Sequence, residues 1–134
     1  MTDTNSEKSN VLLVDDDRFL IDMYCMKFTA QGYNVHACLS VADALQVLRG
    51  GFKPAVIVFD VVMPEHDGLY FLTTIATENL RGGATLFALT NESEDAMQKK
   101  LMELGADRVI VKASMIPSEV VNIVGAEIMR KNKS

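Results

Sequence analysis

The stretch Ala55-Val56-Ile57-Val58-Phe59-Asp60 decides the fold, because five apolar residues without alternation end at a carboxylate. An earlier run, Val11-Leu12-Leu13-Val14, ends in the same way at Asp15 and Asp16. Short continuous apolar runs of this kind are typical of strands buried on both faces of a parallel sheet. Two buried strands therefore deliver carboxylates to one edge of the predicted sheet.

The rest of the chain alternates between strand and helix patterns. Strands are predicted at residues 11–14, 33–38, 55–59, 85–89 and 108–111, and helices at residues 18–31, 40–48, 68–78, 93–104 and 117–131. Ser40 and Ser93 are the predicted N-caps of two of these helices, and Pro117 suits a first helical position. The alternation predicts an α/β fold with a five-stranded parallel sheet and helices on both faces.

The composition fits one globular domain and argues against two classes of partner. The chain has 134 residues, of which 49% are apolar and 23% are charged. Its net charge of -5 disfavours binding to a nucleic-acid backbone. No apolar stretch approaches the roughly 18 residues that a membrane span requires, so we expect no membrane contact and a cytoplasmic protein.

The sulfur-containing residues are predicted to pack in the core. Cys25 and Cys38 lie in apolar-patterned segments without a second pair, which disfavours a disulfide or a zinc site. The methionines on helical patterns are expected to pack as well: Met23, Met26, Met97, Met102 and Met129.

Reactive side chains follow four of the predicted strands: Asp15 and Asp16, Asp60, Thr90, and Lys112. Each alone has an ordinary reading as a helix cap, a structural hydroxyl or a solvated ammonium. Ligands of open α/β sheets bind at the carboxyl ends of the strands, and clustered carboxylates repel one another unless a cation joins them. Mg²⁺ fits best, because it takes oxygen ligands and commonly sits on carboxylates plus a phosphate. Together these groups supply what phosphoryl transfer to an aspartate requires.

Four segments make the chain resemble the receiver domain of bacterial two-component response regulators: Val-Leu-Leu-Val-Asp-Asp-Asp at 11–17, Phe-Asp-Val-Val-Met-Pro-Glu-His-Asp-Gly at 59–68, Ala-Leu-Thr at 88–90 and Val-Lys at 111–112. The resemblance implies a flavodoxin-like sheet with strand order 2-1-3-4-5. It also implies a receiver domain at residues 10–131, with a disordered polar leader at 1–9 and a tail at 132–134.

The same resemblance implies the roles of the site residues. Asp60 would accept the phosphoryl group, and Thr90 and Lys112 would bind phosphoryl oxygens. Mg²⁺ would be held by Asp15, Asp16, Asp60 and the backbone carbonyl of Val62. The donor would be a sensor histidine kinase or a phosphotransfer protein. We expect Asp17 to cap the first helix, and neither His36 nor His66 to be a ligand.

Three positions depart from the family pattern. Val109 stands where the family usually has Tyr or Phe, Asn91 where it prefers a very small residue, and Ala113 where it favours a proline after a cis peptide. We therefore expect a trans bond after Lys112. A signal would travel through Thr90 and the loop at 91–95.

Two functions stay open. The first is a stand-alone phosphoacceptor switch that is not an enzyme in the ordinary sense, has no output domain of its own, does not bind DNA directly and acts by binding an unknown downstream protein. The alternative is a diverged receiver that binds its partner without phosphorylation. An aspartate-nucleophile phosphatase is disfavoured because Val62 stands where its acid-base Asp belongs, and a flavin protein because Asp15 to Asp17 would repel a phosphate. Met97, Met102, Met115 and Ile116 form a possible partner face, although ordinary packing explains them equally well.

Overall fold

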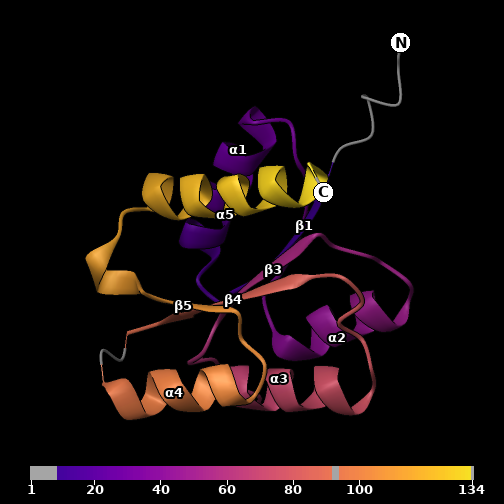
Figure 1. Ribbon diagram of the computed structural model, residues 1–134, viewed down its shortest axis with the longest axis vertical. Helices are drawn as coiled ribbons and strands as arrows, with labels where there is room; N and C mark the ends of the chain where they lie inside the picture. Colours follow the sequence, from indigo (N-terminus) through magenta and orange to yellow (C-terminus); the bar gives the residue numbers. More distant parts are fainter. Residues whose placement is uncertain (1–8, 92–93, 134) are drawn as a thin grey trace.

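The computed structural model describes residues 9–91 and 94–133, which form a parallel sheet between two layers of helices (Figure 1). The strands are β1 (Asn10–Val14), β2 (Asn34–Cys38), β3 (Val56–Asp60), β4 (Thr85–Thr90) and β5 (Arg108–Val111). Neighbouring strands are parallel and their order is β2-β1-β3-β4-β5. The predicted fold class and strand order are confirmed.

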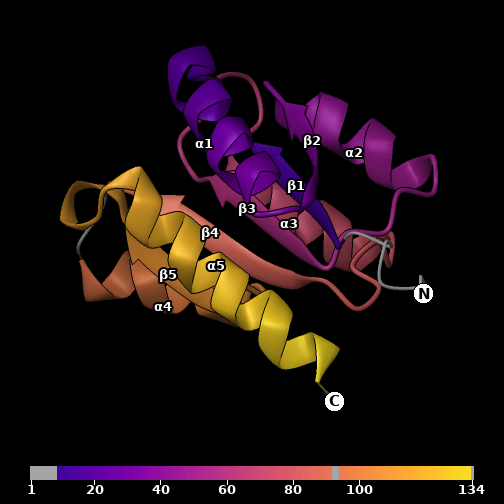
Figure 2. The same ribbon diagram turned by 90° about the horizontal axis from the view of Figure 1, so that it is seen from above.

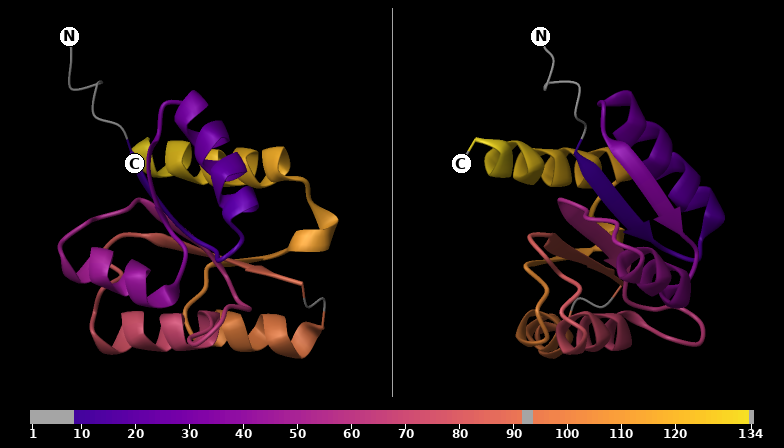
Figure 3. Two further views of the ribbon diagram at one scale, coloured as in Figure 1. Left: turned by 180° about the vertical axis from the view of Figure 1, so that it is seen from behind. Right: turned by 90° about the vertical axis from the view of Figure 1, so that its right-hand side faces the viewer.

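Two helices cover one face of the sheet and three cover the other. They are α1 (Arg18–Ala30), α2 (Val41–Arg49), α3 (Gly68–Thr77), α4 (Asp95–Glu103) and α5 (Pro117–Asn132). Figures 1 and 3 show α1 and α5 on one side, with α2, α3 and α4 on the opposite side. Figure 2, seen from above, shows α1 lying over β1 and α5 over β4 and β5.

Most helices begin next to a side chain that caps their first turn. The carboxylate of Asp17 accepts a hydrogen bond from the Leu20 amide at 3.2 Å, and the Ser40 hydroxyl accepts one from the Asp43 amide at 3.1 Å. The predicted cap at Ser93 lies outside the described residues. Helix α4 begins after Glu94, whose side chain makes no capping hydrogen bond.

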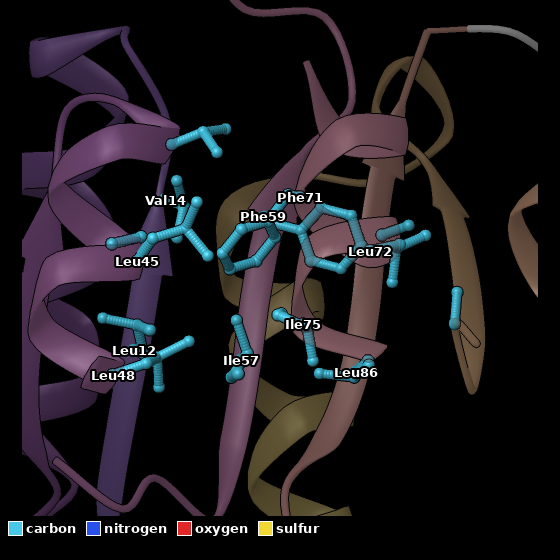
Figure 4. Packing of buried hydrophobic residues seen from close by; sticks show 14 of the residues in the cluster. Leu12, Val14, Leu45, Leu48, Ile57, Phe59, Phe71, Leu72, Ile75 and Leu86 are labelled. Atoms are coloured by element: carbon cyan, nitrogen blue, oxygen red, sulfur yellow. The ribbon is translucent and has the colours of Figure 1, made fainter. Parts of the chain in front are cut away.

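The buried side chains form two layers, one on each face of the sheet. Figure 4 shows the layer under α2 and α3, where the rings of Phe59 and Phe71 meet edge to face at 5.3 Å between centroids. Val58 belongs to the layer under α1 and α5. Because side chains alternate along a strand, Asp60 continues the line of Val58 and lies on the α1–α5 side. This alternation positions the site.

The packing predictions for sulfur-containing residues are partly wrong. Cys38 is buried, Cys25 is partly buried, and both are free thiols. Met26, Met102 and Met129, however, are 67%, 49% and 58% exposed. Helical spacing alone assigned them to the core, but each lies on the solvent side of its helix. Among the described residues, every helix falls short of the length and apolar content of a membrane span.

Candidate functional site

Three carboxylates meet at the carboxyl edge of the sheet. Asp60 is the last residue of β3, and Asp15 and Asp16 follow the neighbouring strand β1 directly. One carboxylate oxygen from each residue lies within 4.8 Å of the other two. In the part of the chain that the structure describes, no other group of His, Cys, Asp or Glu has such spacing. The predicted gathering of these three acids is therefore what the structure shows.

Lys112, the residue directly after β5, reaches this cluster from the far side of β4. Its Nζ lies 3.3 Å from Oδ2 of Asp15 and 3.5 Å from Oδ2 of Asp60. One ammonium thus serves two carboxylates. Three ionised carboxylates and one ammonium leave a net charge of about -2, which a divalent cation would neutralise.

Burial and like charges set the protonation of the two inner acids. Burial first, and then the charge of Asp15, raise the pKa of Asp60 to about 6, against the lowering effects of Lys112 and of the Val62 amide. Burial also raises the pKa of Asp15, although the Asp17 amide donates to it at 2.9 Å and Lys112 lies nearby. Burial opposes the charged form of Lys112, but the charges of Asp15 and Asp60 outweigh it and raise the pKa of Lys112.

The donor set fits magnesium better than a softer metal. Every side-chain donor of the cluster is a carboxylate oxygen, and oxygen is the donor that Mg²⁺ prefers, whereas softer metals prefer nitrogen or sulfur. The amide of Val62 donates to the Asp60 carboxylate, which holds the chain after β3 against the site. Asp16 is exposed, so the cluster opens to solvent on its side.

The remaining predicted positions lie around this cluster. Thr90 is fully buried at the end of β4, beside the pairing partner of Asp60, while Asn91 is exposed. Val109 is partly buried against the core layer under α2, α3 and α4. The described chain has no cis peptide bond, so the trans bond expected between Lys112 and Ala113 is confirmed.

The loop between β3 and α3 is held by one close approach. A Cβ added to Gly68 would lie 2.8 Å from the Cα of Val61, so the backbone passes where a side chain would stand. The Gly68 amide also donates to the Val61 carbonyl at 2.8 Å. Glycine has no Cβ, so it permits this tight passage. Sequence reasoning missed Glu65, whose φ of +68° is unusual for a side chain of this kind.

Sequence reasoning also missed Tyr24. Its helical spacing places it on the inner face of α1, and its side chain is only 5% exposed. Burial first, and then the charges of Asp15 and Asp60, raise the pKa of Tyr24 to about 12. No sequence pattern reveals that this phenol lies in the field of the acidic cluster.

The two histidines lie away from the acids. His36, on the edge strand β2, packs on Phe52 with 5.3 Å between ring centroids. His66, in the loop before α3, stacks on Tyr70 with 4.1 Å between centroids. Both have ring partners that account for their positions.

A second polar cluster lies at the opposite edge of the sheet, around a cavity of about 450 Å³. Lys131, in the last turn of α5, donates to the carbonyls of Ala55 (2.7 Å) and Gly83 and to the hydroxyl of Thr85 (3.3 Å). Next to it, Arg130 pairs with a Glu127 carboxylate oxygen at 2.8 Å. Because both cations have protein partners, we infer that this cluster holds the last turn of α5 against the sheet. We call this cluster the clamp.

Comparison with known proteins points to one family. The model of the response regulator receiver domain matches residues 11–124. The transcriptional regulatory protein YvrH of Bacillus subtilis is 30% identical over 129 residues, which are 96% of this chain and 52% of YvrH, so the chain spans about half of that relative.

Two solved structures share the fold. A CheY-like receiver domain protein from Methanospirillum hungatei has a TM-score of 0.82, 21% identity and coverage of 95% of this chain and 98% of that one. The BeF3-activated receiver domain of DrrB, from Thermotoga maritima, has a TM-score of 0.78, 24% identity and coverage of 92% and 99%.

Proposed function

The chain belongs to the family of response regulator receiver domains of two-component systems, and from this premise we propose that it is a phosphoacceptor switch with Asp60 as the acceptor. The observation that carries the proposal is the convergence of Asp15, Asp16, Asp60 and Lys112 from three separate strands. A cluster of this kind is costly to the metal-free fold, as the raised pKa of Asp60 indicates. We propose that its use is to bind Mg²⁺ and a phosphoryl group.

The proposed chemistry assigns one role to each side chain. A carboxylate oxygen of Asp60 attacks the phosphorus of a phosphohistidine on a sensor histidine kinase or phosphotransfer protein, and the bond from phosphorus to the donor nitrogen breaks. Hydrolysis by water later releases phosphate and restores Asp60. Asp15, Asp16, Asp60 and the Val62 carbonyl would hold Mg²⁺, which would supply positive charge that stabilises the transferred phosphoryl group. Lys112 and Thr90 bind the phosphoryl oxygens. Because all of these groups act on Asp60 of the same chain, the protein promotes only its own modification.

The energy of switching comes from these new contacts. Moving a two-state equilibrium from about 1:99 to 99:1 takes roughly 5.5 kcal/mol. Each charge-assisted hydrogen bond from Lys112 contributes on the order of 1.5 to 3 kcal/mol, and the Thr90 hydroxyl adds a weaker one. With Val109 in place of an aromatic ring, we propose a partial shift that runs through Thr90 and Lys112.

The readout is proposed to be binding of a downstream protein by a cytoplasmic receiver domain formed by residues 10–131. The net charge of -5 gives these residues no attraction to a nucleic-acid backbone, although YvrH is named a transcriptional regulator. Met102 and Ile116 are 49% and 62% exposed and suit an apolar contact. Met97 and Met115 are partly buried against the core.

Incubation with Mg²⁺ and acetyl phosphate, followed by intact mass measurement, tests the proposal. We expect one phosphoryl group on the unmodified chain and none on Asp60→Asn. Asp22→Asn, which changes an exposed acid of α1 outside the cluster, is the matched control and should label normally. BeF3, with which the DrrB structure is described as activated, provides a second probe.

The departures at Val109, Asn91 and Ala113 favour a second candidate, a diverged receiver that binds its partner without phosphorylation. The same experiment separates the two. If calorimetry detects magnesium binding but neither acetyl phosphate nor BeF3 changes the protein, the diverged receiver is supported. Replacing exposed Asn91 with Ala then tests whether that side chain hinders entry, because hindrance predicts faster labelling.

A further inference from the structure

Tyr24 is a buried phenol on the inner face of α1. Its side chain lies in the same buried layer as Leu13 and Val58 and is 5% exposed. Leu13 and Val58 each stand two residues before an acid of the site, Asp15 and Asp60 respectively. Because side chains two apart lie on the same face of a strand, the phenol and both carboxylates share the space between the sheet and α1.

The orientation of α1 directs this phenol toward the acids. The helix begins after Asp17, which follows the cluster directly, and Tyr24 lies seven residues further on, or about 10 Å along the axis. Long helical side chains lean toward the N-terminus of their helix. The charges of both Asp15 and Asp60 act on the Tyr24 hydroxyl, which agrees with this direction.

The hydroxyl has no hydrogen-bond partner among the residues that the structure describes, whereas buried tyrosine hydroxyls usually find one. A phenylalanine would fill nearly the same space without the cost of a buried, unpaired hydroxyl. A buried polar group next to a cluster of carboxylates therefore points to a contact that forms when the cluster holds its ligand.

We propose that Tyr24 is a positioning residue of the acidic site, whose hydroxyl donates a hydrogen bond through a water molecule to the carboxylates of Asp15 and Asp60 when they hold a divalent cation. The phenol closes the inner side of the site, opposite the solvent-facing Asp16. A water in this position has three polar neighbours, which is the usual number for a buried water. The inference rests on the proposed function, because the cation is the magnesium of that proposal.

Calorimetric titration of Tyr24→Phe with Mg²⁺ tests the role. We expect the affinity to fall by about three- to tenfold, the ratio that the loss of one net hydrogen bond gives. Without metal, the same variant should be as stable as the unmodified chain or more stable, because it loses an unpaired buried hydroxyl. A purely structural Tyr24 would leave the affinity unchanged.

Tyr33→Phe is the matched control. The Tyr33 hydroxyl lies over Gly125 of α5, and its removal should leave magnesium affinity unchanged. An equal loss in both variants would overturn the proposal, as would equal affinity of Tyr24→Phe and the unmodified chain.

A spectroscopic measurement reads the contact directly. The chain has three tyrosines and no tryptophan, so the double variant Tyr33→Phe, Tyr70→Phe leaves Tyr24 as its one phenol. Its emission should change on addition of Mg²⁺ with the dissociation constant found by calorimetry, and an unchanged emission contradicts the role. If the unmodified chain binds no magnesium, the proposed function fails together with the inference. If the unmodified chain binds magnesium and Tyr24→Phe binds it equally well, the inference is wrong but the proposed function stands.

Discussion

Replacing Gly68 with alanine should destabilise the protein through the loop that follows Asp60. The added Cβ would lie 2.8 Å from the Cα of Val61, 3.2 Å from the ring of Phe59 and 3.3 Å from the carbonyl oxygen of Asp60. Carbon atoms prefer separations of about 3.5 to 4.0 Å, so the backbone must move by roughly 0.7 Å. Overpacking costs up to about 3 kcal/mol and the helix propensity of alanine returns about 1, which leaves a net loss of about 2 kcal/mol.

Urea unfolding of Gly68→Ala and Gly83→Ala measures this difference. Gly83 is the matched control, because a Cβ there meets no atom within 4 Å and its φ is not in the left-handed region. We expect Gly83→Ala to change the free energy of unfolding by less than about 0.5 kcal/mol. If Gly68→Ala behaves like Gly83→Ala, the close passage does not constrain the loop and the reasoning is wrong. Magnesium affinity should fall in Gly68→Ala alone, since only this loop directly follows Asp60.

Three further substitutions test the raised pKa of Asp60, the left-handed backbone at Glu65 and the clamp formed by Lys131. Because folding raises the pKa of Asp60 from 3.8 to about 6, the folded state binds that proton more tightly. The metal-free protein should therefore gain up to about 3 kcal/mol as the pH falls from 7 to 4, and urea unfolding of Asp60→Asn should show a flatter profile. Glu65→Gly should stabilise by about 1 kcal/mol in the same assay, because glycine adopts a φ of +68° freely, while Asn79→Gly, from an asparagine at +54°, should gain less. Lys131→Met should cost about 1 to 2 kcal/mol by depriving two carbonyls of their donor, whereas exposed Lys133→Met should be nearly neutral; equal effects would contradict the clamp.

The sequence predicted the sheet and the acidic cluster because both depend on a simple rule of periodicity. Continuous apolar runs identified the buried strands, and the carboxyl ends of parallel strands meet at one edge. Asp15 and Asp60 therefore had to be neighbours once their strands paired. Lys112 was predicted at the same edge, but its shared contact with both acids depends on the reach of a long side chain across β4, which spacing does not encode.

Residue spacing could not predict other features of the structure, because these depend on the neighbours of a residue in the folded chain. Helical periodicity predicts that both Tyr24 and Met26 pack against the core. Only the positions of α5 and the sheet, however, decide which of these two side chains is covered. Met26 proved to be 67% exposed and Tyr24 only 5%. The strained backbone at Glu65 was equally invisible, because no residue preference marks a glutamate for the left-handed region.

The shared contact of Lys112 suggests how a signal would leave the site without the aromatic ring. A phosphoryl group on Asp60 would offer Lys112 a more strongly charged acceptor than the two carboxylates it now shares. Lys112 is also the first residue of the short 3-10 turn Lys112–Ser114, which joins β5 to the segment leading into α5. A shift of its ammonium toward Asp60 therefore pulls on this turn and on exposed Ile116 beyond it. This route needs no movement of Val109, whose stiff β-branched side chain stays packed in the layer on the other face of the sheet.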